Sequence, residues 1–206
     1  MNSQIKAVSG GVFCLGGNDI DTDRIIPAEF LKCVTFEGLG RNVFKHDRAQ
    51  LGGQHPFDLP ENQGRPILVV DANFGSGSSR EHAVPALMQS GIKAIIGLSF
   101  AAIFRGNAVG NGLVCVEVSP AHHNDLLAAI QQQEVQEFDI DLEAMTIRLK
   151  IFGDSTDPVI PCTMPDSHRE MLTTGRWDSL ATALEAGDLI GQTAARLPYM
   201  EVALVA

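Results

Sequence analysis

The sequence predicts an α/β fold with a mixed, largely parallel core sheet and a C-terminal helical extension. From residue 67 onward, short aliphatic runs alternate with helical segments over short connections, which is typical of βαβ units and a parallel sheet. From residue 138, apolar and charged residues alternate with period two on two arms that turn near 144–145, which predicts an antiparallel hairpin. After residue 166 the pattern is helical again.

Three buried strands are expected in the parallel part, because each is an aliphatic run without the polar alternation of a half-exposed strand. They cover residues 67–70, 92–97 and 112–118. Between the first two we predict a helix over 82–90, with Gly91 just past its end. Ser119 and Pro120 predict the N-cap and the first position of the helix after the third strand.

The flanking segments complete the predicted domain organisation. The first seventy residues are rich in glycine and irregular, and only residues 28–33 suggest a short helix. Two helical segments are expected near the C-terminus, at 166–173 and 178–186. We therefore divide the chain into a domain over residues 1–165 and a helical extension over 166–206, packed on the same domain.

Composition narrows the classes of function. The chain has 206 residues with 15 basic and 25 acidic side chains, a formal net charge of −10. Such a charge argues against nucleic acid or an anionic membrane surface as a partner. No apolar run reaches the ~18 residues of a membrane span, and the N-terminus has no signal-like apolar core. We expect a cytoplasmic protein without nucleic acid or membrane partners, in which any anion site is built locally.

The four cysteines are scattered, at positions 14, 33, 115 and 162, and they form no C-x-x-C pair. The six histidines add no H-x-x-x-H or H-E-x-x-H spacing. Zinc and iron–sulfur ligands are usually spaced as such close pairs. We therefore expect reduced, mostly buried thiols and no metal site held by this chain.

One segment is unusual: residues 75–81 read G-S-G-S-S-R-E and lie between a predicted strand and a predicted helix, where α/β folds bind ligands. The glycines let backbone N–H groups approach an anion, and Arg80 can clamp a carboxylate or phosphate with two hydrogen bonds. The segment is neither a P-loop, nor a dinucleotide fingerprint, nor a hydrolase nucleophile elbow. Two serines beside an arginine can supply an oxygen base if nearby donors stabilise the alkoxide form.

A purely structural interpretation of the same segment stays open. Ser78 and Glu81 have the spacing of a capping box, in which the serine caps the helix and the glutamate reaches back to it. That register would place Pro85 inside the helix, where proline removes a hydrogen bond and clashes with the preceding turn. The segment is therefore either a ligand-binding turn or a helix cap.

A second polar segment, over residues 18–27, reads N-D-I-D-T-D-R-I-I-P. Its three aspartates within five residues are reminiscent of a loop for a hard cation, but the glycine and the terminal glutamate of an EF-hand are missing. We interpret these aspartates as capping and turn residues.

Several motifs together carry a family resemblance. They are G-N-D-I-D-T-D-R-I-I-P at 17–27, F-L-K-C-V-T-F-E-G-L-G at 30–40, N-F-G-S-G-S-S-R-E-H-A at 73–83, I-F-R-G-N at 103–107, T-G-R-W-D at 174–178 and L-P-Y at 197–199. With them the chain resembles the small subunits of 3-isopropylmalate dehydratase, which are swivel domains of the aconitase superfamily. The resemblance implies a swivelling β/β/α domain. It also implies a hydro-lyase activity in leucine biosynthesis, the isomerisation of 2-isopropylmalate to 3-isopropylmalate through 2-isopropylmaleate.

The resemblance also implies roles for individual residues. Ser78 matches the serine whose alkoxide removes the proton alpha to a carboxylate. Arg80 matches the arginine that clamps a substrate carboxylate, and its neighbours belong to the same anion-binding turn. The substrate-binding residues implied in this way are Gly77, Ser79, Arg80, Thr22 and Asp23.

The loop over residues 32–40 matches the segment thought to distinguish substrate side chains. Here it offers Val34, Phe36 and Leu39, which can accommodate an isopropyl group. Related hydratases acting on homoaconitate, citraconate or a dimethylmaleate-type acid remain alternatives. A longer acid with an extra carboxylate would need a cation near Phe36, and the loop has only Lys32, at its edge.

The resemblance places the family's [4Fe-4S] cluster in a separate large subunit, so no cofactor is expected on this chain. The partners implied are that large subunit, in a heterodimer or higher heteromer, and a small hydroxy-dicarboxylic acid as substrate. We expect the chain to be inactive alone. The alternative from another class is a non-catalytic anion-binding module, which would bind phosphorylated ligands without any partner.

Overall fold

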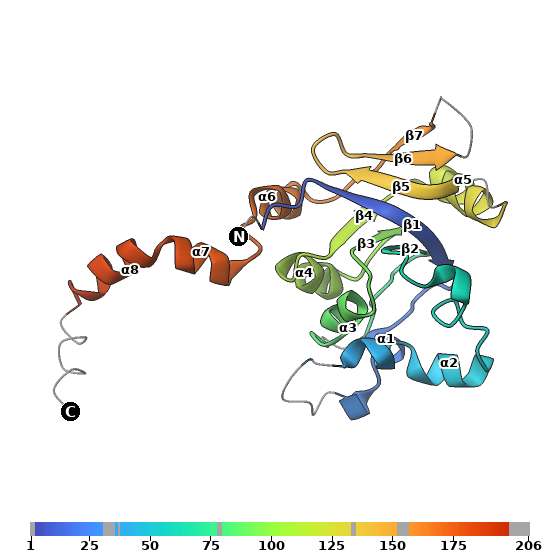
Figure 1. The fold of residues 1–206 in the computed structure, drawn as a ribbon, viewed down its shortest axis with the longest axis horizontal. Coiled ribbons are helices and arrows are strands. Elements are labelled where there is room, and N and C mark those ends of the chain that lie inside the picture. The colour runs from blue at the N-terminus through green and yellow to red at the C-terminus, as the bar shows by residue number, and fades with distance from the viewer. Residues whose placement is uncertain are drawn as a thin grey trace.

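The computed structural model describes residues 3–30, 36, 38–77, 80–132, 135–151 and 157–197. Three of the predicted site residues, Val34, Ser78 and Ser79, lie outside these ranges. A single seven-stranded sheet, with the strand order β4-β3-β2-β1-β5-β6-β7, forms the centre of the fold (Figure 1).

The sheet has a parallel half and an antiparallel half that meet at β1. The strands are β1 (Ala7–Leu15), β2 (Ile67–Val70), β3 (Ala94–Gly97), β4 (Val114–Glu117), β5 (Val135–Asp141), β6 (Thr146–Ile151) and β7 (Val159–Pro161). Neighbours from β1 to β4 run parallel, whereas β1–β5, β5–β6 and β6–β7 run antiparallel. The predicted mixed α/β class and the predicted hairpin are both confirmed.

Strand β1 lies in the glycine-rich part that we expected to be irregular. Its glycines serve close packing against the segment that leads into β2. A Cβ atom on Gly10 would come within 2.4 Å of Pro66, and one on Gly11 within 2.9 Å of Arg65. Glycine within a strand commonly marks such a close approach of another backbone or side chain. Strand β1 thereby becomes the central strand of the sheet.

The described residues contain eight helices, and all but the last two lie against the sheet domain (Figure 1). They are α1 (Thr22–Ile25), α2 (Lys45–Leu51), α3 (Ala83–Gln89), α4 (Ala102–Gly110), α5 (Pro120–Gln131), α6 (Asp166–Thr174), α7 (Ser179–Glu185) and α8 (Gly187–Ala194), with short 3-10 turns η1 (Ala28–Phe30), η2 (Leu39–Asn42) and η3 (Pro60–Asn62). Ser119 caps α5 as predicted, because its Oγ accepts a hydrogen bond from the N–H of His122. None of the described helices has the length and apolar character needed to cross a membrane.

The buried residues form two clusters, one on each face of the sheet. Alternate residues of β2 point to opposite faces, so Leu68 and Val70 pack beneath α1, α3 and α4, whereas Ile67 and Val69 pack toward α5 and the hairpin. This is why β2 is a continuous aliphatic run without polar alternation. The first cluster supports the edge of the sheet at which the predicted site residues lie.

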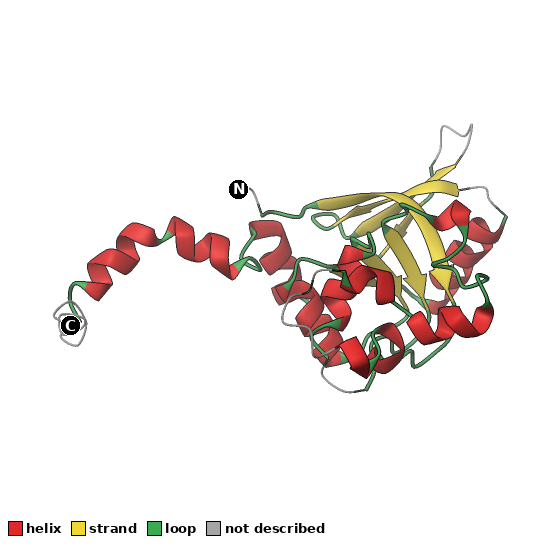
Figure 2. Cartoon of the chain, turned by 60° about the horizontal axis from the view of Figure 1, so that its bottom comes forward, coloured by secondary structure: helices red, strands yellow, loops and turns green. Residues whose placement is uncertain are grey.

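We expected the C-terminal extension to pack on the domain, and its described helices do so only in part. Helix α6 packs against α4 and buries Leu172. Helices α7 and α8 instead extend away from the domain in both views (Figures 1 and 2). Their leucine side chains at 180, 184 and 189 are each at least 65 % exposed. Helix α6 therefore belongs structurally to the domain, and α7 and α8 form a projecting arm.

Candidate active site

The loops that follow β1, β2 and β3 meet at one edge of the sheet, because the carboxyl ends of parallel strands lie on the same side. Backbone hydrogen bonds join the first loop to the second and the second to the third. They run from Asp19 N to Ala72 O (2.9 Å), Gly75 N to Ile20 O (2.8 Å), Thr22 N to Ser76 O (2.9 Å), Phe74 N to Ser99 O (3.1 Å) and Ala101 N to Phe74 O (3.0 Å). Both polar segments singled out in the sequence are thus parts of one site.

The three aspartates of the first loop have separate structural tasks. Asp21 caps α1, since its carboxylate accepts a hydrogen bond of 2.8 Å from the N–H of Arg24. Asp19 accepts a hydrogen bond of 2.7 Å from the side chain of Asn73, and Asp23 forms an ion pair with Arg80. In the part of the chain that the structure describes, no group of three or more His, Cys, Asp or Glu residues could hold a metal. The cap formed by Asp21 agrees with the interpretation as capping and turn residues, whereas Asp19 and Asp23 hold neighbouring side chains.

Arg80 is held in place from two sides. Besides its ion pair with Asp23, its Nη1 donates a hydrogen bond of 3.3 Å to the backbone oxygen of Ile26. The Arg80 side chain is 15 % exposed, whereas that of Asp23 is 55 % exposed. A guanidinium has five N–H donors, so these two contacts leave donors for a bound anion. Arg80 is thus positioned before any ligand arrives.

Helix α3 begins later than a capping box at Ser78 requires. Its first residue is Ala83, and His82 occupies the N-cap position without a side-chain hydrogen bond to the helix. The capping-box interpretation is therefore wrong. Pro85 is the third residue of α3, in the first turn, where a missing N–H costs no helical hydrogen bond. The regular helix therefore begins after the glycine-rich turn, at Ala83.

A cavity of about 210 Å³ opens where the three loops meet. It is lined by Thr22, Gly75, Gly77, Arg80, Ala101, Ala102, Ile103, Phe104 and Asn107. The structure thus brings Thr22, Gly77 and Arg80 together at one cavity, and Asp23 reaches the same place through its ion pair with Arg80.

The contribution of α4 to this cavity goes beyond the sequence-based expectations, which include no helix between the strands at 92–97 and 112–118. Asn107 lines the cavity from the second turn of α4, and its side-chain amide has no hydrogen-bond partner among the described residues. It belongs to the motif I-F-R-G-N, to which we had assigned no role. Asn107 follows the strand that comes next after the glycine-rich turn, and polar residues after neighbouring parallel strands meet at one edge of the sheet. This position in the sequence is the signal that could have identified it.

Of the predicted specificity loop, the described residue Phe36 contacts the segment that follows the glycine-rich turn. The ring of Phe36, which is 43 % exposed, makes an edge contact with His82, with 5.3 Å between ring centroids. Leu39 is 1 % exposed and belongs to the core cluster beneath, so its side chain supports the loop from below. Val34 lies outside the described residues.

Gly75 is a position at which the geometry of the site depends on the absence of a side chain. Its φ is +77°, and a Cβ atom there would lie 2.2 Å from Cγ of Phe104. We expect Gly75→Ala to lower the free energy of unfolding by at least ~3 kcal/mol, because backbone strain and overpacking add. Gly91→Ala is the matched control: its φ is +105°, but a Cβ meets nothing within 4 Å. Equal losses for the two variants in urea unfolding would contradict this account of Gly75.

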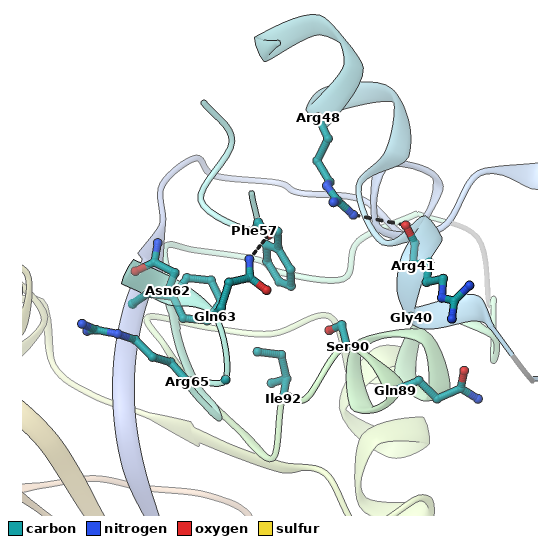
Figure 3. Close-up of a pocket in the computed structure, with 12 residues that line it drawn as sticks. Gly40, Arg41, Arg48, Phe57, Asn62, Gln63, Arg65, Gln89, Ser90 and Ile92 are labelled. Carbon is teal, nitrogen blue, oxygen red and sulfur yellow. Dashed lines mark hydrogen bonds between the residues drawn. The ribbon is translucent and has the colours of Figure 1, made fainter. Parts of the chain in front are cut away.

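A second polar cavity, of about 240 Å³, lies elsewhere (Figure 3). Arg65 and Ile92, which line this cavity, each lie two residues before a strand, β2 and β3 respectively. The cavity is therefore at the amino ends of the parallel strands, opposite the usual ligand-binding edge. Arg48 is paired with Asp58 at 2.6 Å, and Arg65 donates to two backbone oxygens. Arg48 and Arg65 of this cavity are therefore already bound to partners within the fold, which leaves them few donors for a ligand.

The described cysteines do not fit an iron–sulfur cluster. Cys14 lies on β1, Cys115 on β4 and Cys162 just after β7, each as a free thiol. Burial raises the pKa of all three thiols, that of Cys162 to about 12. A metal ligand must be a thiolate, which these environments disfavour.

The fold and the cavity define a domain of the aconitase type, in which a glycine-rich turn with an arginine lies at the carboxyl edge of a parallel sheet. Residues 6–121, more than half of the chain, match the family model described as the aconitase C-terminal domain.

The relatives narrow this class. A 3-isopropylmalate dehydratase small subunit from Synechocystis is 47 % identical over 198 residues, which cover 96 % of each chain. One from Thermus thermophilus is 44 % identical over 202 residues, covering 97 % of this chain and 98 % of the relative. The crystal structure of 3-isopropylmalate dehydratase from Methanocaldococcus jannaschii superposes with a TM-score of 0.62 at 26 % identity, covering 88 % of this chain and 99 % of that one. The chain belongs to the family of 3-isopropylmalate dehydratase small subunits.

Proposed function

We propose that this chain is the small subunit of a hydro-lyase that interconverts 2-isopropylmalate and 3-isopropylmalate through 2-isopropylmaleate, in leucine biosynthesis. The observation that carries the proposal is the cavity at the carboxyl ends of β1 to β3, in which Arg80 is already held beside the turn that contains Ser78. The names of the relatives agree with this activity.

Recognition of a dicarboxylic acid follows from the lining of the cavity. Arg80 supplies the cationic fork that binds one carboxylate with two parallel hydrogen bonds. Helix α4 begins at the same cavity, and the methyl side chain of its N-cap residue Ala101 cannot accept a hydrogen bond from the first-turn N–H groups. Such free N–H groups favour negative charge nearby. On a chain of net charge −10, this concentration of donors supports a substrate-anion site.

Ser78 is the residue to which we assign the proton transfer. It lies in the chain between Gly77 and Arg80, both of which line the cavity. In the dehydration direction, the proton alpha to the clamped carboxylate passes to the Ser78 oxygen as the carbon–carbon double bond forms. Donors near the serine must stabilise its alkoxide form, and the guanidinium of Arg80 and the backbone of the glycine-rich turn are suited to this.

The hydroxyl that leaves in dehydration needs an acid that the described residues of this cavity do not supply. The family resemblance places a [4Fe-4S] cluster for this task in the large subunit, and the small-subunit names of the relatives imply such a partner. The chain therefore contributes the base and the carboxylate clamp. We propose that it works in the cytoplasm, where its free thiols would stay reduced.

Asn107 is expected to donate a hydrogen bond to the substrate from the α4 side of the cavity. Asn107→Ala should raise KM about 10-fold and change kcat less, because a hydrogen bond to a charged group contributes ~1.5–3 kcal/mol. Asn107→Asp should raise KM further, because its charge repels a dicarboxylate. Steady-state kinetics of the assembled enzyme check this, and an unchanged KM in both variants would remove Asn107 from the binding site.

A substrate panel tests the proposed reaction. The chain is co-expressed with the large subunit of 3-isopropylmalate dehydratase from the same source, and the ultraviolet absorbance of the unsaturated acid is followed. We expect turnover of 2-isopropylmalate to exceed that of citramalate or homocitrate. Preference for either of the other acids would indicate a related hydratase. Binding of inorganic phosphate or a phosphorylated ligand by the chain alone, with no activity upon assembly, would indicate an anion-binding module.

A further inference from the structure

Helices α7 and α8, over residues 179–194, form what we call the C-terminal arm. The arm projects from the domain (Figure 1), and it presents Leu180, Leu184, Leu189 and Ile190, which are 69, 74, 65 and 52 % exposed. These are half of the eight large apolar side chains that the described chain exposes. Leu180 and Leu184 are four residues apart and share one face of α7. So dense an apolar surface marks an interaction site.

The arm begins at a well-anchored base. The indole Nε1–H of Trp177 donates a hydrogen bond of 2.6 Å to the backbone oxygen of Ser3, and the Ser3 hydroxyl donates one of 2.9 Å to Asp178. The ring of Trp177 packs against Gly112, where a Cβ atom would lie 2.7 Å from it. Asp178 also caps α7 by accepting a hydrogen bond of 2.8 Å from Ala181 N. The fold thus fixes the point and the direction from which the arm starts.

The arm is linked to the candidate site through two packed helices, α6 and α4. Helix α6, which leads into the arm, packs against α4, and the first turn of α4 lines the cavity. At the mouth of that cavity Ile103 is 55 % exposed. A partner that covers the cavity and Ile103 can therefore extend along α4 and α6 to the arm without leaving the surface.

Two observations favour the large subunit, rather than a second copy of this chain, as the protein that binds the arm: the charge of the arm and the extent of the alignments with small subunits. Residues 179–194 contain two acidic and no basic residues, in a chain of net charge −10, so two copies repel each other. The family model stops at residue 121, but the alignments with small subunits span 96–97 % of the chain and so include the arm. The arm thus belongs to the separate small subunits and lies outside the domain that the family model describes.

We propose that the C-terminal arm docks into an apolar groove with a basic rim on the large subunit and holds the open cavity against it. The identity of this partner rests on the proposed function. In this arrangement the arm stays bound to the large subunit while the domain that carries the cavity moves relative to it. The arm is therefore a tether, and the chemistry is done at the cavity.

The test uses the full chain and the purified large subunit in a binding titration. The double variant Leu180→Asp, Leu184→Asp should bind about 100-fold more weakly, since two central apolar anchors are lost. Leu184→Ala keeps helix propensity and should weaken binding about 10-fold. Leu51→Asp, on α2 with 51 % exposure, is the matched control and should bind normally. The melting temperature of each arm variant alone should equal that of the unmodified chain, because these side chains are exposed.

Unchanged affinity in both arm variants would overturn the proposal. It would also be overturned if the chain alone were a dimer that the arm variants dissociate, because the occupant would then be a second copy. If binding depends on the arm but the complex does not convert 2-isopropylmalate, docking stands and the proposed function fails. If the complex is active and both arm variants bind normally, the proposed function stands and the docking fails.

Discussion

Ser78→Ala is expected to lower the kcat of the assembled enzyme about 10³-fold, with KM changed by less than a few-fold. A positioned base contributes ~10²–10⁴-fold to a proton transfer, and alanine has no oxygen to accept the proton. Because the carboxylate clamp at Arg80 stays intact, binding of the ground state should be preserved.

Ser76→Ala is the matched control for this prediction. Ser76 lies in the same turn, but its hydroxyl donates a hydrogen bond of 3.2 Å to the backbone oxygen of Asp19 and so has a structural role. Activity of Ser76→Ala should stay within a few-fold of the unmodified enzyme, measured by the absorbance of 2-isopropylmaleate. A Ser78→Ala enzyme as active as Ser76→Ala would show that another group removes the proton.

Arg80→Lys is expected to lower kcat/KM about 100-fold, chiefly through KM. Lysine keeps the positive charge but has no planar fork, so it cannot hold Asp23 and Ile26 and still offer two parallel donors to a carboxylate. Loss of a charge-assisted hydrogen bond of this kind is worth ~1.5–3 kcal/mol, which is a 10- to 100-fold effect, and the altered orientation adds to it.

The control for Arg80→Lys is Arg24→Lys. Arg24 lies on α1 and pairs with Asp47 at 2.8 Å. Neither residue of this pair lines the cavity. The Arg24 side chain is 45 % exposed, so the pair contributes little, and both stability and KM should stay near those of the unmodified protein. If KM for 2-isopropylmalate is the same in Arg80→Lys as in Arg24→Lys, the carboxylate clamp must be another residue.

The helices and strands that are well predicted from the sequence are those whose pattern lies entirely within their own residues. The buried runs of β2 and β3, the period-two hairpin of β5 and β6, and the Ser119–Pro120 start of α5 each have a local signature, and each is present. Strand β1 was missed because its glycines make sense only with Pro66 and Arg65 packed against them. Helix α4 was missed because its apolar first turn continues the pattern of the strand before it.

Part of the candidate site was also predictable, because it too has a local sequence signature. The glycine-rich turn and Arg80 stand out in the sequence, and a ligand site after a parallel strand is a general property of α/β sheets. The contribution of Asn107 depends on three separate loops ending at one edge, which follows from the strand order and from no single motif.

The central claim is that this chain supplies one half of an active site, with Arg80 and Ser78 at the cavity and the remaining chemistry on a partner. A titration of purified large subunit with this chain, read as the initial rate of 2-isopropylmaleate formation from 3-isopropylmalate, tests it most directly. The account predicts no rate with either subunit alone and a rate that rises with added chain to saturation. Turnover by the chain alone, or no turnover at any ratio although the two proteins bind, would contradict it.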